Sequence, residues 1–148
     1  MASYRTHAEI GAPPAIVFAQ LATAEGLAGW LGHAARIDPV PGGRFQVDIG
    51  AVTMAGEVLA LEPPHRLVLS WGLVGSPDFP PGASRLSFRL RATAGGTRVD
   101  LVHTGLPDAR GGSHVEGWRH FVPRLVRAAT GLPVETEFWM PGGGRAGA

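Results

Sequence analysis

One long amphipathic segment, residues 113–131, follows a series of strand-like runs and most restricts how this chain can fold. Its apolar residues recur at steps of three and four, so they form one stripe of a helix. A helix of that length spans about 28 Å, which is enough to cross a small domain. The pattern predicts a helix buried against a sheet, and a sheet that curls around it leaves room for a pocket. The stripe consists of Val115, Trp118, Val122, Leu125 and Ala129.

The ends of this helix carry recognisable signals. Ser113 followed three residues later by Glu116 matches a capping box, so we expect the helix to begin there. Gly131 and Pro133 mark its end. Pro123 lies in the interior, where proline removes a backbone hydrogen bond, and it predicts a kink.

The preceding chain has six runs typical of strands and two short apolar stretches typical of helices. The helices are expected near residues 16–21 and 25–31, after a proline pair. Glycine and proline separate most of the runs, and such short connections favour antiparallel neighbours. The expected strands are residues 4–10, 44–49, 52–61, 66–71, 84–91 and 97–104.

Length and composition favour one soluble domain without a metal or disulfide staple. The chain has 148 residues, no cysteine and a formal charge of +1. We expect no extended nucleic-acid surface, because such proteins usually concentrate basic residues in one stripe. Neither a signal segment nor a membrane-spanning apolar run is visible, so no membrane insertion is expected and a cytoplasmic location is the default.

Alternation along the strands predicts which side chains face the long helix. Thr97, Val99, Leu101 and His103 share one face of the last strand and should point inward. The run 52–61 is ambiguous because both phases contain apolar residues, and we favour Val52, Met54 and Val58 inward. The other inward sets are Phe45, Val47 and Ile49; Leu67, Leu69 and Trp71; and Leu86, Phe88 and Leu90.

Five segments in this order resemble small bacterial proteins related to the activator of the ninety-kilodalton heat-shock chaperone ATPase, within the START and birch-pollen-allergen superfamily. They are "APPAIVFAQLATAEGLAGWLG", "PVPGGRF", "GEVLALEPPHRLVLSW", "GTRVDLVHTGLP" and the pair Gly117 and Trp118. The resemblance implies an α+β helix-grip fold, in which a curved antiparallel sheet of about six strands and two short helices wraps a long carboxy-terminal helix. On this basis residues 1–132 form one domain, and residues 133–148 form an extension that is either an edge strand or a flexible tail.

The resemblance also implies an apolar cavity between the sheet and the long helix, since relatives bind hydrophobic molecules. Each candidate has a plainer alternative: the aromatic residues can be ordinary core, and His103 can have a structural hydrogen-bond partner. Trp118 is the favoured cavity residue, because its stripe must face the sheet. The predicted ligand-binding residues are Trp30, Met54, Trp71, Phe88, Leu101, His103, Trp118 and Phe121.

Catalytic and metal-binding patterns are absent from the sequence. His114 and His120 are six residues apart, which does not place them on one helix face, and we predict no metal site. No nucleophile elbow, phosphate loop or dinucleotide fingerprint occurs, and no cofactor is expected. Asp48 and Glu57 fall on the outward phase of their strands, so acid-base work by them is not expected.

Three hypotheses for function follow. The first is noncatalytic binding or transport of a small hydrophobic molecule, and the second is a cyclase-, dehydratase- or hydrolase-like enzyme that uses cavity acid-base residues. The third is a stress-response or co-chaperone-like module that binds another protein with a filled core. Either a monomer or a homodimer fits the sequence.

Overall fold

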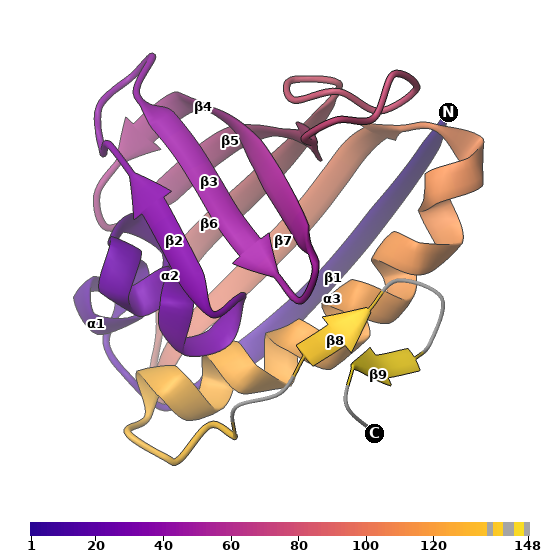
Figure 1. The fold of residues 1–148 in the computed structure, drawn as a ribbon. Coiled ribbons are helices and arrows are strands. Elements are labelled where there is room, and N and C mark those ends of the chain that lie inside the picture. Colours follow the sequence, from indigo (N-terminus) through magenta and orange to yellow (C-terminus); the bar gives the residue numbers. More distant parts are fainter. Residues whose placement is uncertain (136–137, 141–143, 147–148) are drawn as a thin grey trace.

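A curved sheet wraps around one long helix (Figure 1). The computed structural model describes residues 1–135, 138–140 and 144–146. Two short helices follow the first strand, and the long helix follows the last strand of the main sheet. In chain order the elements are β1 (Ala2–Ile10), α1 (Pro14–Ala22), α2 (Ala24–Trp30), β2 (Ala34–Ile37), β3 (Arg44–Ile49), β4 (Val52–Glu62), β5 (Arg66–Leu73), β6 (Ser84–Thr93), β7 (Gly96–Leu106), α3 (Asp108–Ala129), β8 (Phe138–Met140) and β9 (Gly144–Ala146).

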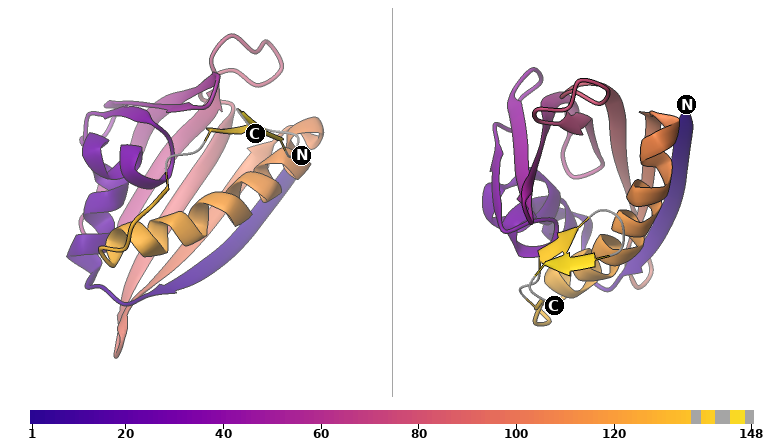
Figure 2. Two further views of the ribbon diagram at one scale, coloured as in Figure 1. Left: turned by 60° about the horizontal axis from the view of Figure 1, so that its bottom comes forward. Right: turned by 45° about the vertical axis from the view of Figure 1, so that its right-hand side comes forward.

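The main sheet has seven strands in the order β1-β7-β6-β5-β4-β3-β2, and every neighbouring pair is antiparallel. Strands β2 to β7 follow one another along the chain as a meander, whereas β1 pairs with β7. The helix α3 runs along the concave side next to β1 (Figure 2). This is the predicted helix-grip arrangement of an α+β fold.

Alternation correctly predicted the buried face of the sheet. In β7 the residues Thr97, Val99, Leu101 and His103 are all buried, and their neighbours along the strand are half-buried. In β4 the favoured phase is also correct at Met54 and Val58, which are 6 % and 0 % exposed, while Val52 is half-buried. The remaining inward sets on β3, β5 and β6 are buried as well.

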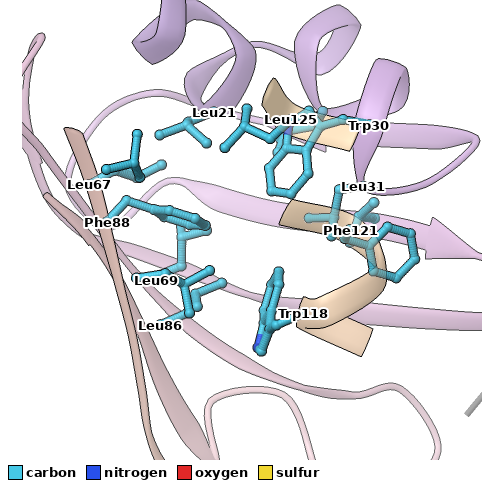
Figure 3. Packing of buried hydrophobic residues seen from close by; sticks show 14 of the residues in the cluster. Leu21, Trp30, Leu31, Leu67, Leu69, Leu86, Phe88, Trp118, Phe121 and Leu125 are labelled. Carbon is cyan, nitrogen blue, oxygen red and sulfur yellow. The ribbon is translucent and has the colours of Figure 1, made fainter. Parts of the chain in front are cut away.

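The core fills the space between the sheet, the two short helices and α3 (Figure 3). Trp30 at the end of α2 meets Phe88 of β6 edge to face, with ring centroids 6.4 Å apart. Its indole Nε1 donates to the carbonyl oxygen of Gln20 at 2.8 Å, so its polar atom is satisfied inside the core. One buried aromatic residue, Phe79, comes from the loop between β5 and β6.

The predicted start of the long helix is wrong. Helix α3 begins at Asp108 after Pro107, and Ser113 lies inside it, where its hydroxyl donates to the carbonyl oxygen of Arg110 at 3.1 Å. Gly111 and Gly112 made the first turns of α3 hard to predict, because glycine in a helix is about 1 kcal/mol less favourable than alanine. A side chain on Gly111 would approach Ala2 Cβ to 2.9 Å, so its lack of one lets α3 pack closely on β1.

The other end of the helix agrees better with the sequence. Helix α3 ends at Ala129, and Gly131 has a φ of 74°, which is the left-handed conformation expected just after a helix. Pro123 lies inside the helix as predicted. Among the described residues, no helix is both long and apolar enough to cross a membrane.

One strand of the main sheet was not predicted. The strand β2, which pairs with β3 at the edge of the sheet, makes seven strands in place of about six. In the carboxy-terminal extension, β8 pairs with β9 and not with the main sheet, and its backbone lies near β3. Residues 136–137, 141–143 and 147–148, which fall in the predicted extension, lie outside the described residues.

Candidate functional site

A small apolar cavity of about 50 Å³ lies between the β3–β4 hairpin and the middle of α3. The hairpin supplies one wall and the helix supplies the other. Most of the lining atoms are carbon, and the polar side chains in the lining belong to α3. The lining residues are Ile49, Val52, Met54, Ser113, His114, Gly117, Trp118 and Phe121.

Local geometry explains why these residues meet. Gly50 has a φ of 59°, which allows the tight turn that places Ile49 opposite Val52 in the β3–β4 pair. On the helix, positions 114, 117, 118 and 121 are three or four residues apart and therefore share one face. Gly117 is buried and has no side chain, so it leaves space that a larger residue would fill.

A buried hydrogen-bond chain lies beside the cavity wall formed by Trp118. The indole Nε1 of Trp118 donates to Nδ1 of His103 at 3.1 Å. His103 Nε2 lies 2.8 Å from the hydroxyl of Ser84, and that hydroxyl donates to the carbonyl oxygen of Trp71 at 2.8 Å. His103 is completely buried, so every polar atom of its ring depends on these partners.

A second hydrogen-bond chain runs from Trp71 to helix α3. Trp71 Nε1 donates to Nε2 of His114 at 3.0 Å, and His114 Nδ1 lies 2.8 Å from the carbonyl oxygen of Arg110. The rings of His103 and His114 meet edge to face with centroids 5.1 Å apart. The ring of Phe79 also meets that of His114 edge to face, with centroids 5.3 Å apart.

These contacts fix the protonation state of both histidines. A tryptophan N–H can only donate, so the ring nitrogen facing each indole must be an unprotonated acceptor. His103 therefore carries its proton on Nε2 and donates it to Ser84, while His114 carries its proton on Nδ1 and donates it to Arg110. Both rings are neutral.

Electrostatics favours the same neutral forms. Burial, together with a smaller effect of the nearby His114, lowers the pKa of His103 to about 3. Burial also lowers the pKa of His114 below its usual value; the carbonyl of Arg110 opposes this shift, and the positive charge of Arg110 adds to it. Arg110 itself is held by Asp78, with 3.2 Å between nitrogen and oxygen.

The predicted ligand-binding residues fall into three places. Met54, Trp118 and Phe121 line the cavity. Trp71 and His103 belong to the adjoining hydrogen-bond chains. Trp30, Phe88 and Leu101 are buried in the core and do not line the cavity.

Sequence reasoning missed several of the lining residues. Ile49 and Val52 were predicted to face inward but were not assigned to a site. Ser113 was interpreted as a helix cap, and His114 was considered only as a possible metal ligand together with His120. The available signal for His114 was its position four residues before Trp118, which places both on one helix face.

The residues considered for acid-base or metal chemistry lie elsewhere. Glu57 is exposed on β4, and Asp48 accepts a hydrogen bond from the hydroxyl of Thr53 at 2.7 Å. Within the part of the chain that the structure describes, no group of three or more histidine, aspartate or glutamate side chains is arranged to hold a metal ion.

Comparison with known proteins gives one family and many similar folds. The model of the family described as Activator of Hsp90 ATPase homolog 1-like protein matches residues 11–130. An AHSA1-like protein of Rhizobium etli is 35% identical, with a TM-score of 0.71, and the match covers 94% of this chain and 89% of that one. No curated protein matches.

More distant structures share the fold. A protein of Mesorhizobium loti is 24% identical, with a TM-score of 0.76, over 90% of this chain and 100% of that one. The Aha1 protein of Colwellia psychrerythraea, whose solution structure is a dimer, is 19% identical, with a TM-score of 0.74, over 87% of this chain and 96% of that one.

Proposed function

The chain belongs to the Activator of Hsp90 ATPase homolog 1-like family, and from that premise we propose that it binds a small hydrophobic molecule, without catalysis, in the cavity between the β3–β4 hairpin and α3. The observation that carries the proposal is the apolar lining of that cavity. Ile49, Val52 and Met54 face Trp118 and Phe121 across it. Apolar groups that leave water for such a site gain free energy in proportion to the surface they bury.

The size of the cavity restricts the ligand. Ligand pockets usually enclose about 300–1,000 Å³, whereas this cavity holds about 50 Å³. It therefore accommodates one apolar end of a molecule, and the remainder lies outside the cavity. A short alkyl chain fits this description better than a polycyclic compound.

The hydrogen-bond chains support a noncatalytic role. A general base needs a free lone pair directed at the substrate. Both ring nitrogens of His103 and both of His114 are engaged with protein atoms. The hydroxyl of Ser84 donates to Trp71, so its proton is not directed to His103 as it is in an activated nucleophile.

A co-chaperone-like module that binds another protein is the second candidate, because the core is largely filled and the cavity is small. The dimer formed by the Colwellia relative makes a homodimer worth testing as well as a monomer. This candidate predicts that hydrophobic ligands of different length bind equally weakly, since none would enter a defined site.

A series of linear alcohols from methanol to hexan-1-ol, which begins below the size of the cavity, distinguishes the two candidates. Each methylene that enters the cavity contributes about 0.8 kcal/mol, so the affinity should rise about fourfold per carbon until the cavity is full, and then level off. Titration followed by NMR should shift the signals of Gly117 and the methyl group of Met54.

The variant Val52→Phe should abolish this response, because the larger half-buried side chain fills the cavity. Val40→Phe is the matched control: Val40 is 49 % exposed and is not among the cavity-lining residues, so its variant should bind like the original protein. Equal affinity for all alcohols, or equal binding by Val52→Phe, would contradict the proposal and favour the second candidate.

A further inference from the structure

Arginine side chains gather on the outer face of strands β1, β7 and β6, the face turned away from α3. All basic residues of this chain other than histidine are arginine, and the net charge is only +1. Five of them nevertheless alternate outward on these three strands. This face borders a hollow of about 700 Å³. The five are Arg5, Arg85, Arg89, Arg91 and Arg98.

Strand register places three of these arginines around a neutral floor. Ser87 of β6 lies opposite Val102 of β7, and Val102 lies opposite Arg5 of β1. Arg85 and Arg89 flank Ser87 two positions away on either side, so each lies about 6.6 Å along the strand from it. Arg5 lies about 9.6 Å from Ser87 across two strand spacings. Three long side chains can therefore converge over Ser87 and Val102.

Two acidic side chains, Glu9 and Asp100, lie on the same face of these strands, and Glu9 is opposite Arg98 in the β1–β7 pair. Asp100, which lies opposite Arg89, receives hydrogen bonds from Arg98 at 3.1–3.3 Å. Beside β6, Glu62 at the end of β4 forms an ion pair with Arg66 at the start of β5, at 2.8 Å. Among the described residues, Arg5, Arg85 and Arg89 make no ion pair within the hollow or outside it.

Two like-charged pairs stand directly opposite each other across the strands. Arg66 lies opposite Arg89, and Arg91 lies opposite Arg98. Such pairs destabilise a sheet when no anion lies between them. Glu62 and Asp100 already neutralise one arginine of each pair, Arg66 and Arg98. Of the remaining two, Arg89 borders the hollow, and an anionic ligand there would compensate its charge.

We propose that this face is a binding site for a small compound carrying two or more phosphate groups, held by Arg5, Arg85 and Arg89 over Ser87 and Val102. Guanidinium groups match phosphate oxygens with two parallel hydrogen bonds, and three of them around one floor suit several linked phosphates. The lining of the hollow contains no Phe, Tyr or Trp on which the bases of a single-stranded nucleic acid would stack. Val102 is its one large apolar residue, so it lacks the apolar surface that inserts into a membrane.

Calorimetric titration with orthophosphate, pyrophosphate and tripolyphosphate tests the site. Affinity should rise at least tenfold from orthophosphate to tripolyphosphate, and it should fall steeply as salt is added, because the contacts are between charges. Amide signals of Ser87 and Val102 should shift in NMR spectra of the tripolyphosphate complex.

The double variant Arg85→Gln/Arg89→Gln should weaken tripolyphosphate binding at least tenfold. Its matched control is Arg36→Gln/Arg44→Gln, which removes the same charge from exposed positions on β2 and β3. Because all four side chains are exposed, both variants keep the core intact. The single variant Arg5→Gln, from a different strand, gives an independent check.

Several results would overturn the proposal. They are the absence of tripolyphosphate binding, equal affinity for the three phosphates, and equal weakening by the control variant. A single-stranded oligonucleotide and vesicles with anionic lipid serve as further arms. Binding of either one without binding of tripolyphosphate would assign the face to a macromolecule or a membrane surface and not to a small phosphate compound.

Discussion

Ser84 is a buried hydroxyl that joins two other polar groups. It accepts a hydrogen bond from His103 Nε2 and donates one to the carbonyl oxygen of Trp71, and it is 4 % exposed. The substitution Ser84→Ala would leave the buried Nε2–H of His103 without an acceptor, at a cost of about 1–3 kcal/mol of stability. Urea denaturation measures the difference directly.

Ser87→Ala provides the comparison on the same strand. Ser87 faces outward and is half-buried, so its replacement should change the free energy of unfolding by less than about 0.5 kcal/mol. Equal stabilities of the two variants would show that the hydrogen bonds of Ser84 contribute nothing.

Neutral His103 also makes stability depend on pH. In the unfolded chain a histidine titrates near its ordinary value of about 6.5, whereas burial lowers the pKa of His103 in the fold to about 3. Between these values the unfolded chain binds more protons, so the free energy of unfolding falls as the pH falls. Within this pH range, one such group lowers the free energy of unfolding by at most about 1.4 kcal/mol for each unit by which the pH falls. The lowered pKa of His114 acts in the same direction.

Denaturation at pH 7, 6 and 5 tests this dependence before most carboxylates titrate. The variant His103→Gln lacks the titrating ring, and its stability should fall less steeply over the same range. If the two proteins lost stability in parallel, the histidine would have no part in the pH dependence.

At the scale of single elements, the two possible starts of α3, at Asp108 and at Ser113, predict different effects of one substitution. If Ser113 were the helix cap, replacing it with alanine would cost about 1 kcal/mol. In the structure Ser113 is inside the helix. Alanine has the higher helix propensity by about 0.5 kcal/mol, so Ser113→Ala should leave the stability unchanged or raise it slightly. A loss near 1 kcal/mol in thermal or urea denaturation would restore the capping interpretation.

Most elements were predictable because their burial alternates with a regular period. The buried faces of β6 and β7 follow directly from Leu86, Phe88, Val99 and Leu101. The strand β2 was missed because its four residues, Ala34–Ile37, begin with two small side chains and give no clear alternation. The first turns of α3 were missed because the need for glycine there comes from β1, which is remote in the sequence.

At the scale of the whole molecule, the candidate site was only partly predictable. Alternation indicates which side chains face inward, but it does not tell whether the space beside them is filled. That depends on how closely α3 approaches each strand. Phe88 and Leu101 lie in filled core, while Met54 and Phe121 border a cavity. His114 gained its role through Trp71, a contact between residues 43 positions apart.

Net charge was a poor guide to surface charge for the same reason. A total of +1 suggested no concentrated basic surface. The register of three strands, of which β1 is remote in the sequence from β6 and β7, brings Arg5 near Arg85 and Arg89. Only the folded sheet shows this arrangement.

The central claim is that the cavity beside Trp118 and Val52 holds a hydrophobic molecule. Native mass spectrometry of protein purified under gentle conditions tests it most directly, with the original chain and Val52→Phe measured side by side. We predict that the original protein carries a bound apolar compound that is released on denaturation, and that Val52→Phe has only the mass of its own chain. The claim would be contradicted if neither protein carried a bound compound, or if both retained the same one.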